Sequence, residues 1–166
     1  MQTTERSKTD WQHFRELERK RHNSFFLPQY ERLNMEVVED ISNDTQTNPY
    51  DVLVRYKGSL LKVEEKTRTK IWDHLLVEVM QCLRSGRVGW IYNKDIHYLF
   101  DTMWKSEQDE EPEVAYLVQF PKLKDFVIEN FDKLPSGTSS KGYGLTYFKK
   151  AAWHDLEYLK IAQRVL

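Results

Sequence analysis

The sequence is poor in cysteine and lacks any long hydrophobic run. Its 166 residues contain one cysteine, Cys82, so no disulfide can form within the chain, and the apolar stretch around it predicts a buried thiol in a reducing compartment. No apolar run approaches the roughly 20 residues needed to cross a bilayer. The polar start, MQTTERSKTD, has no apolar core of the kind found in signal peptides. We therefore expect a cytoplasmic protein with no membrane partner.

The sequence also has little net charge. Its 25 basic and 26 acidic residues give a net charge of -1, with a pI near 6.5. Proteins that only coat nucleic acid are usually basic, so the overall charge disfavours that role, although it allows a local basic face around an acidic site. The 40% of hydrophobic residues is enough for a globular core, and the length suits a single domain over 1–166.

Several common catalytic signatures are missing. The five histidines form no HxH or HExxH pair, which together with a single cysteine argues against a zinc site. No Walker A loop, dinucleotide-binding fingerprint or GxSxG elbow occurs. These chemistries are therefore disfavoured.

The hydrophobic pattern predicts an α/β protein with a central mixed sheet. Helices are expected at 9–21, with a capping box from Thr9 to Gln12, and at 71–83, 123–131 and 152–165. Strands are expected at 35–41, 51–56, 60–67, 88–92, 96–104, 114–120 and 145–150. The polar segments 42–50, 107–113 and 135–144 are expected to be loops. This order favours a sheet with helices on both faces.

The clearest local signal is a hairpin around Lys57-Gly58, between the strands expected at 51–56 and 60–67. A two-residue turn there fixes the register, so that the numbers of facing residues sum to 115. Asp51 then lies opposite Glu64, and Cβ atoms of facing residues are roughly 4.5–5.5 Å apart.

The residues around Glu64 suggest a cation site. Because side chains alternate along a strand, Lys66 shares the face of Glu64, whereas Glu65 points to the other face. The carboxylates of Asp51 and Glu64 would repel each other unless a cation lay between them. Mg²⁺ is suited to this role because it takes one or two carboxylates and keeps several waters. The alternative is a surface hairpin with a hydrated polar face.

The motif Pro49-Tyr50-Asp51, followed after twelve residues by Glu64-Glu65-Lys66, resembles that of the PD-(D/E)xK nucleases, which include restriction endonucleases, Holliday-junction resolvases and phage exonucleases. The resemblance extends over 9–104 and includes the expected helices before and after the hairpin and a strand pair at 89–92 and 97–100. It implies a restriction-endonuclease-like core.

The same resemblance implies a mechanism. Asp51 and Glu64 would bind Mg²⁺, or Mn²⁺ in its place, and the backbone carbonyl of Glu65 would add a ligand. Lys66 would activate the attacking water or steady the phosphate of a DNA substrate, while the metal polarises the phosphoryl oxygen. A nuclease that cuts both strands usually presents two sites, so a homodimer is expected.

Some family members add a carboxylate from the first helix. Glu18 continues the stripe of Trp11 and Phe14 and therefore leans toward the core side. It is a candidate extra metal ligand, unless it pairs with Arg21 or His22. Glu78 is a similar candidate in the helix expected after the hairpin, where the alternative is a polar helix border.

Four basic residues are candidates for phosphate contacts. Arg19 and Arg21 stand at the end of the first expected helix, where the helix dipole alone would favour cations. Arg68 and Lys70 follow the motif strand. The leading hypothesis is thus a metal-dependent DNA endonuclease of phage or bacterial origin. The alternative is a catalytically inert module with the same fold that binds DNA or protein.

Overall fold

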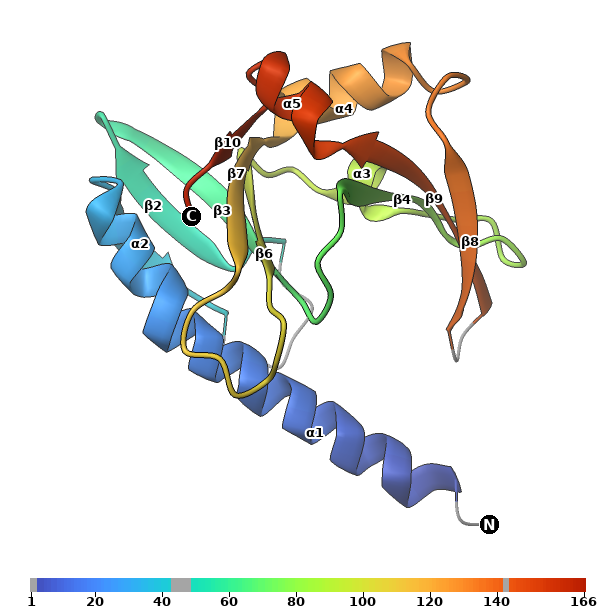
Figure 1. Cartoon of the computed structure of the whole chain (residues 1–166), viewed down its shortest axis with the longest axis horizontal. Coiled ribbons are helices and arrows are strands. Elements are labelled where there is room, and N and C mark those ends of the chain that lie inside the picture. The colour runs from blue at the N-terminus through green and yellow to red at the C-terminus, as the bar shows by residue number, and fades with distance from the viewer. Residues whose placement is uncertain (1–2, 43–48, 142–143) are drawn as a thin grey trace.

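The computed structural model describes residues 3–42, 49–141 and 144–166 (Figure 1). Its helices are α1 (Thr3–Arg21), the π-helix η1 (His22–Phe26), α2 (Leu27–Arg32), α3 (Trp90–Asn93), α4 (Phe120–Glu129) and α5 (Trp153–Tyr158). Its strands are β1 (Glu36–Asp40), β2 (Val52–Tyr56), β3 (Ser59–Arg68), β4 (His74–Cys82), β5 (Arg87–Val88), β6 (Tyr98–Met103), β7 (Val114–Gln119), β8 (Ser136–Lys141), β9 (Gly144–Ala152) and β10 (Ala162–Arg164). No helix among the described residues is long and apolar enough to span a membrane.

The strands form two sheets. A six-stranded mixed sheet has the order β1-β2-β3-β6-β7-β10, and a four-stranded antiparallel sheet has the order β5-β4-β9-β8. Within the larger sheet only β3 and β6 pair in parallel. A parallel pair needs a crossover connection, and here β4, β5 and α3 supply it. The expected mixed sheet is confirmed, and the second sheet is an addition to it.

The larger sheet is covered on both faces. The π-helix η1 and helix α2 pack on one face through an aromatic cluster in which the ring centroids of Phe26 and Phe100 are 5.1 Å apart. The other face packs against the second sheet, α4 and α5, through a core that includes Leu75, Leu99, Val118, Leu123 and Trp153. The expected helices on both faces are therefore present only in part, because one covering layer is largely a sheet.

The helix expected at 71–83 is wrong, since this segment forms β4. Its apolar residues fit both periods, but Leu75, Val77 and Val79 are buried at every second position, as in a strand that faces a core. Trp72 and Leu83, which a core helix would have buried, lie outside the strand and are exposed. Pairing with β9 over most of its length decides the outcome.

Two more elements differ from expectation because pairing overrides local propensity. The segment 135–144, expected to be a loop, contains β8, which pairs with β9 from Ser136 opposite Lys149 onward. The helix expected at 152–165 ends at Tyr158, after which the chain turns through Lys160, with a φ of 55°. It then adds β10 to the edge of the larger sheet, opposite β7.

Most of the remaining elements lie where they were expected. The strands expected at 35–41, 51–56, 60–67, 96–104, 114–120 and 145–150 and the helix at 123–131 are confirmed, with ends shifted by a few residues. The strand expected at 88–92 is wrong, because only β5 is extended and α3 follows. The capping box at Thr9 is also wrong, because α1 already begins at Thr3. The loop 107–113 is confirmed, whereas 43–48 of the loop 42–50 lie outside the described residues.

Candidate active site

The hairpin of β2 and β3 has the expected register. Tyr56 faces Ser59 and Val52 faces Val63, so the numbers of facing residues sum to 115. The turn uses positive φ at both central residues, 49° at Lys57 and 83° at Gly58, as a tight two-residue hairpin requires.

Asp51 lies where this hairpin ladder ends. Its backbone N–H donates to the carbonyl of Val63 at 2.9 Å, and its carboxylate Oδ2 accepts the backbone N–H of Glu65 at 2.7 Å. The side chain therefore takes the place on β3 that a further strand residue would occupy. Burial, followed by the charge of Glu64, raises the pKa of Asp51 to about 7. The charges of Asp51 and Glu64 thus repel each other, although the ladder ends at Val52 and Val63 and does not pair Asp51 with Glu64.

Glu64 carries two lysine partners. Its Oε2 lies 2.8 Å from Nζ of Lys94, which follows α3, and its Oε1 lies 3.5 Å from Nζ of Lys66. Lys66 and Glu64 therefore share one face of β3, as expected from the alternation. The positive charge of Lys66 also opposes the rise in the pKa of Asp51. The structure thus brings Asp51, Glu64 and Lys66 together.

The oxygen donors at this point fit a hard divalent cation. In an extended strand the carbonyl and the N–H of one residue point to the same side, and the N–H of Glu65 faces Asp51, so its carbonyl would lie on that side as well. Among the described residues, no three His, Cys, Asp or Glu side chains are grouped to hold a metal. A cation would rely on two carboxylates, one carbonyl and water, a donor set that suits Mg²⁺. The pKa of Asp51 is raised first by burial and then by the negative charge of Glu64, which such a cation would neutralise.

Glu65 has a role that the sequence analysis missed. Its side chain is 8% exposed and accepts hydrogen bonds from Nδ1 of His22 at 2.7 Å and from the hydroxyl of Tyr30 at 2.9 Å. Nε2 of His22 in turn bonds to Oδ2 of Asp40 at 2.8 Å. One signal was available: Glu65 shares the face of the buried Val63, and a carboxylate on a buried face needs partners.

Burial and charge act in opposite directions on this cluster. Burial alone lowers the pKa of His22, but the hydrogen bonds and charges of Glu65 and Asp40 outweigh it and raise the pKa to about 9. Burial raises the pKa of Glu65, because it outweighs the hydrogen bonds from His22 and Tyr30. A carboxylate faces each ring nitrogen of His22, so the cluster holds two acceptors around one imidazole. His22 is therefore a protonated donor to both.

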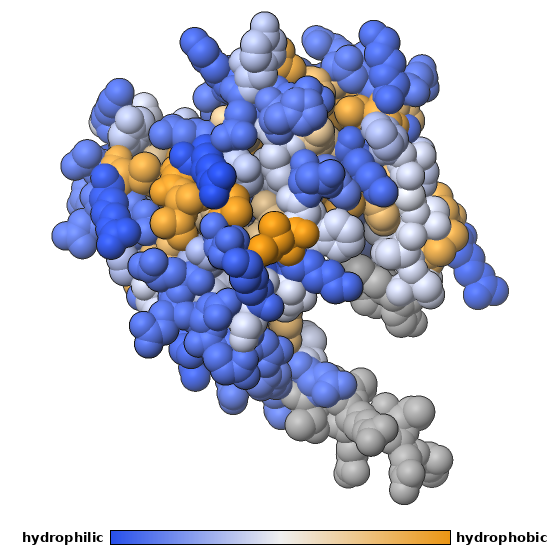
Figure 2. All heavy atoms as spheres, viewed as in Figure 1, coloured by the Kyte–Doolittle hydropathy of each residue, from blue (hydrophilic) through white to orange (hydrophobic). Residues whose placement is uncertain are grey.

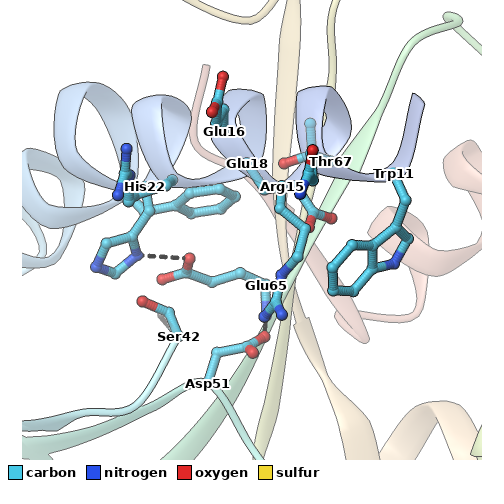
Figure 3. A pocket seen from close by; sticks show the side chains of 12 residues that line it. Trp11, Arg15, Glu16, Glu18, His22, Ser42, Asp51, Glu65 and Thr67 are labelled. Atoms are coloured by element: carbon cyan, nitrogen blue, oxygen red, sulfur yellow. Dashed lines mark hydrogen bonds and ion pairs between the residues drawn. The ribbon is translucent and has the colours of Figure 1, made fainter. Parts of the chain in front are cut away.

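A pocket of about 750 Å³ lies beside Asp51 and Glu65 and is roofed by α1 (Figure 3). The lining residues from α1 include Trp11, Gln12, Arg15, Glu18 and Arg19; His22 lines the pocket from η1, and Thr67 lines it from the sheet. Glu18 is exposed at its surface, so the core-side position expected for it is wrong. Its carboxyl nevertheless lies among enough protein atoms that burial raises its pKa, against the charges of Lys66 and Arg15.

The candidate phosphate contacts are dispersed. Arg19 is exposed and lines the pocket, and Lys70 is exposed after β3. Arg68 is ion-paired with the buried Asp101 at 2.7 Å. Arg21 is 2% exposed and lies over the ring of Trp104 at 4.3 Å, which removes it from the surface.

Other predicted groups do not reach the site. Glu78 lies on β4, opposite Phe148 in the second sheet, and does not line the pocket. Cys82 is buried, as expected. Comparisons of the chain with protein families, curated proteins and solved structures found no match.

Proposed function

We propose that this protein is a metal-dependent deoxyribonuclease, an endonuclease that hydrolyses phosphodiester bonds at Asp51, Glu64 and Lys66. The observation that carries the proposal is the convergence of these three residues at the end of the β2–β3 ladder, where burial and then the charge of Glu64 raise the pKa of Asp51 to about 7. Two carboxylates held together in this way store repulsion that a divalent cation relieves.

In the proposed mechanism, each group of the chain has a separate role. Asp51 and Glu64 would bind Mg²⁺, or Mn²⁺ in its place, with the carbonyl of Glu65. When bound, the ion would supply Lewis acidity and a more acidic water. Lys66 lies beside Glu64 and would balance the charge that develops on the phosphoryl group. Asp51 keeps its orientation through the N–H of Glu65.

The surroundings can accommodate DNA. Figure 2 shows that the coloured part of α1 is mainly hydrophilic and extends below the body of the molecule. Arg19 on this arm and Lys70 after β3 are exposed and would contact backbone phosphates. Arg68 would contribute less, because Asp101 already binds it.

The test is an incubation with single-stranded, duplex, nicked and four-way DNA in the presence of Mg²⁺, Mn²⁺ or EDTA. Lys66→Ala should lower the cleavage rate about a hundredfold or more but should leave Mg²⁺ binding intact or slightly tighter. Asp51→Ala should weaken both, since it removes a ligand. Lys62→Ala is the matched control, because Lys62 also lies on β3 but pairs with Asp95 at 2.9 Å.

One observation favours the second candidate, a catalytically inert module that binds DNA or protein. Lys94 and Lys66 already neutralise Glu64 without a metal. A parent protein that binds DNA but cleaves none of these substrates with either metal would establish that function and overturn ours.

The homodimer stays a prediction. Trp90 and Ile91, two large apolar residues that follow Val88, pack largely into the core. Any dimer interface would have to use other residues. Light scattering that shows a strict monomer at high concentration would end this idea.

A further inference from the structure

One stripe of α1 faces the pocket. Trp11, Arg15 and Glu18 are spaced by four and three residues, which places them on one side of α1. His22, the first residue of η1, follows them, and all four line the pocket. Figure 3 shows them above Asp51 and Glu65. The stripe runs from an exposed end at Trp11 to the buried His22 beside the proposed metal site.

The exposed end of the stripe is not explained by packing. Trp11 is 58% exposed and belongs to neither core cluster. The guanidinium of Arg15 lies 4.9 Å from the centroid of its ring, which leaves much of the indole open to solvent. An aromatic ring backed by a guanidinium is the combination on which nucleic-acid bases stack, since every base offers a π-face.

We propose that Trp11 and Arg15 form a subsite that stacks an unpaired base of the DNA strand whose phosphate lies at Asp51 and Glu64. This inference rests on the proposed function and names its substrate class: single-stranded DNA, or duplex DNA with a single-stranded arm. Bases within a duplex are stacked on one another and cannot reach the indole without being extruded.

The dimensions and charges agree with this occupant. Trp11 precedes Glu18 by seven residues, or roughly 10 Å along the helix axis, which is about three base steps of a stacked strand. Arg15 and Arg19, one turn apart on α1, both line the pocket and would meet the intervening phosphates. The pocket, at about 750 Å³, has room for more than one nucleotide.

The experiment is a binding measurement by fluorescence anisotropy, with Ca²⁺ in place of Mg²⁺ so that binding is read without cleavage. The probes are a labelled oligo-thymidine strand, the same strand with abasic sites, and a blunt duplex. The variants are Trp11→Ala, Trp11→Phe and Phe14→Ala. Phe14 is the matched control, because it is an exposed aromatic on the same helix and is not among the described residues that line the pocket.

Trp11→Ala should weaken binding of the oligo-thymidine strand roughly 5- to 150-fold, the range typical of losing one base–aromatic stack. Trp11→Phe should retain most of the affinity, and Phe14→Ala should bind like the parent. Binding of the duplex and of the abasic strand should change less than about twofold in every variant.

The inference is overturned if Trp11→Ala binds the oligo-thymidine strand as the parent does. It is also overturned if Phe14→Ala is equally weak or if either variant changes the oligomeric state, because α1 would then be a general apolar or dimer surface. Failure of the proposed function looks different. In that case the parent cleaves no DNA with Mg²⁺ or Mn²⁺, while single-strand binding still depends on Trp11.

Discussion

The two faces of β3 treat adjacent glutamates in opposite ways. Glu64 is held by the flexible side chains of Lys66 and Lys94, which can move away when a cation arrives. Glu65 is held by His22 and Tyr30, which are themselves buried and cannot move without disturbing the aromatic core. A cation could therefore replace the lysine partners of Glu64, which suits metal binding. Glu65 is fixed, which suits holding the backbone of β3 in place. The same substitution at both positions, Glu64→Gln and Glu65→Gln, tests whether the two faces differ.

The largest difference should appear in folding stability. Glu65→Gln removes the charge that faces the buried His22, and breaking a buried ion pair on one side costs about 3 kcal/mol or more. Glu64→Gln removes a charge that is about as buried, with 10% of the side chain exposed, but its lysine partners can move into solvent, so the loss should be smaller than in Glu65→Gln. Urea unfolding at pH 7 measures both. Equal losses for the two variants would show that the faces do not differ.

The side chain of Glu65 therefore matters to the fold, beyond the backbone carbonyl that was expected as a metal ligand. Loss of cleavage in Glu65→Gln would now have two sources, unfolding and misplacement of Asp51. A thermal melt separates them, because a variant in which Asp51 is only misplaced is still folded at the assay temperature.

The second difference concerns pH. The folded-state pKa of His22, about 9, lies above its usual value of 6.5. Its contribution to stability is therefore fully present below pH 6.5 and is lost as the pH rises through 9. A shift of this size corresponds to at most about 3 kcal/mol. Unfolding free energies measured from pH 6 to pH 10 should fall more steeply in the parent than in His22→Gln, and parallel curves would contradict the proposed ion pair.

The smallest effect concerns the metal. Binding of Mg²⁺ to the folded state alone should raise stability by about 1.4 kcal/mol at a concentration ten times Kd. The gain should be larger at pH 8 than at pH 6, because the pKa of Asp51 is about 7 and protons compete with the ion below it. Asp51→Asn should abolish the gain, as calorimetry can show. A gain that persists in this variant would place the ion elsewhere.

The hairpin was predictable because its signals agree. The turn dipeptide Lys57-Gly58 and the alternation in β3 specify one register. That register alone predicted that Asp51 lies close to Glu64. In β4 the signals conflict, since apolar residues at both spacings allow a helix or a strand, and only pairing with β9 decides. The cluster of His22, Tyr30 and Glu65 joins residues 43 and 35 positions apart, and no local pattern encodes contacts at such separations.

The π-helix η1, from His22 to Phe26, also sets the orientation of the arm that precedes it. A π turn holds one residue more than an α turn, so it acts as a rotational offset between α1 and α2. Each residue of an α-helix advances the direction of the side chains by about 100°. Deleting one residue within His22–Phe26 would regularise the helix and rotate Trp11, Arg15 and Glu18 together by about that angle, away from the pocket. The single extra residue in η1 thus determines which side of α1 faces the sheet.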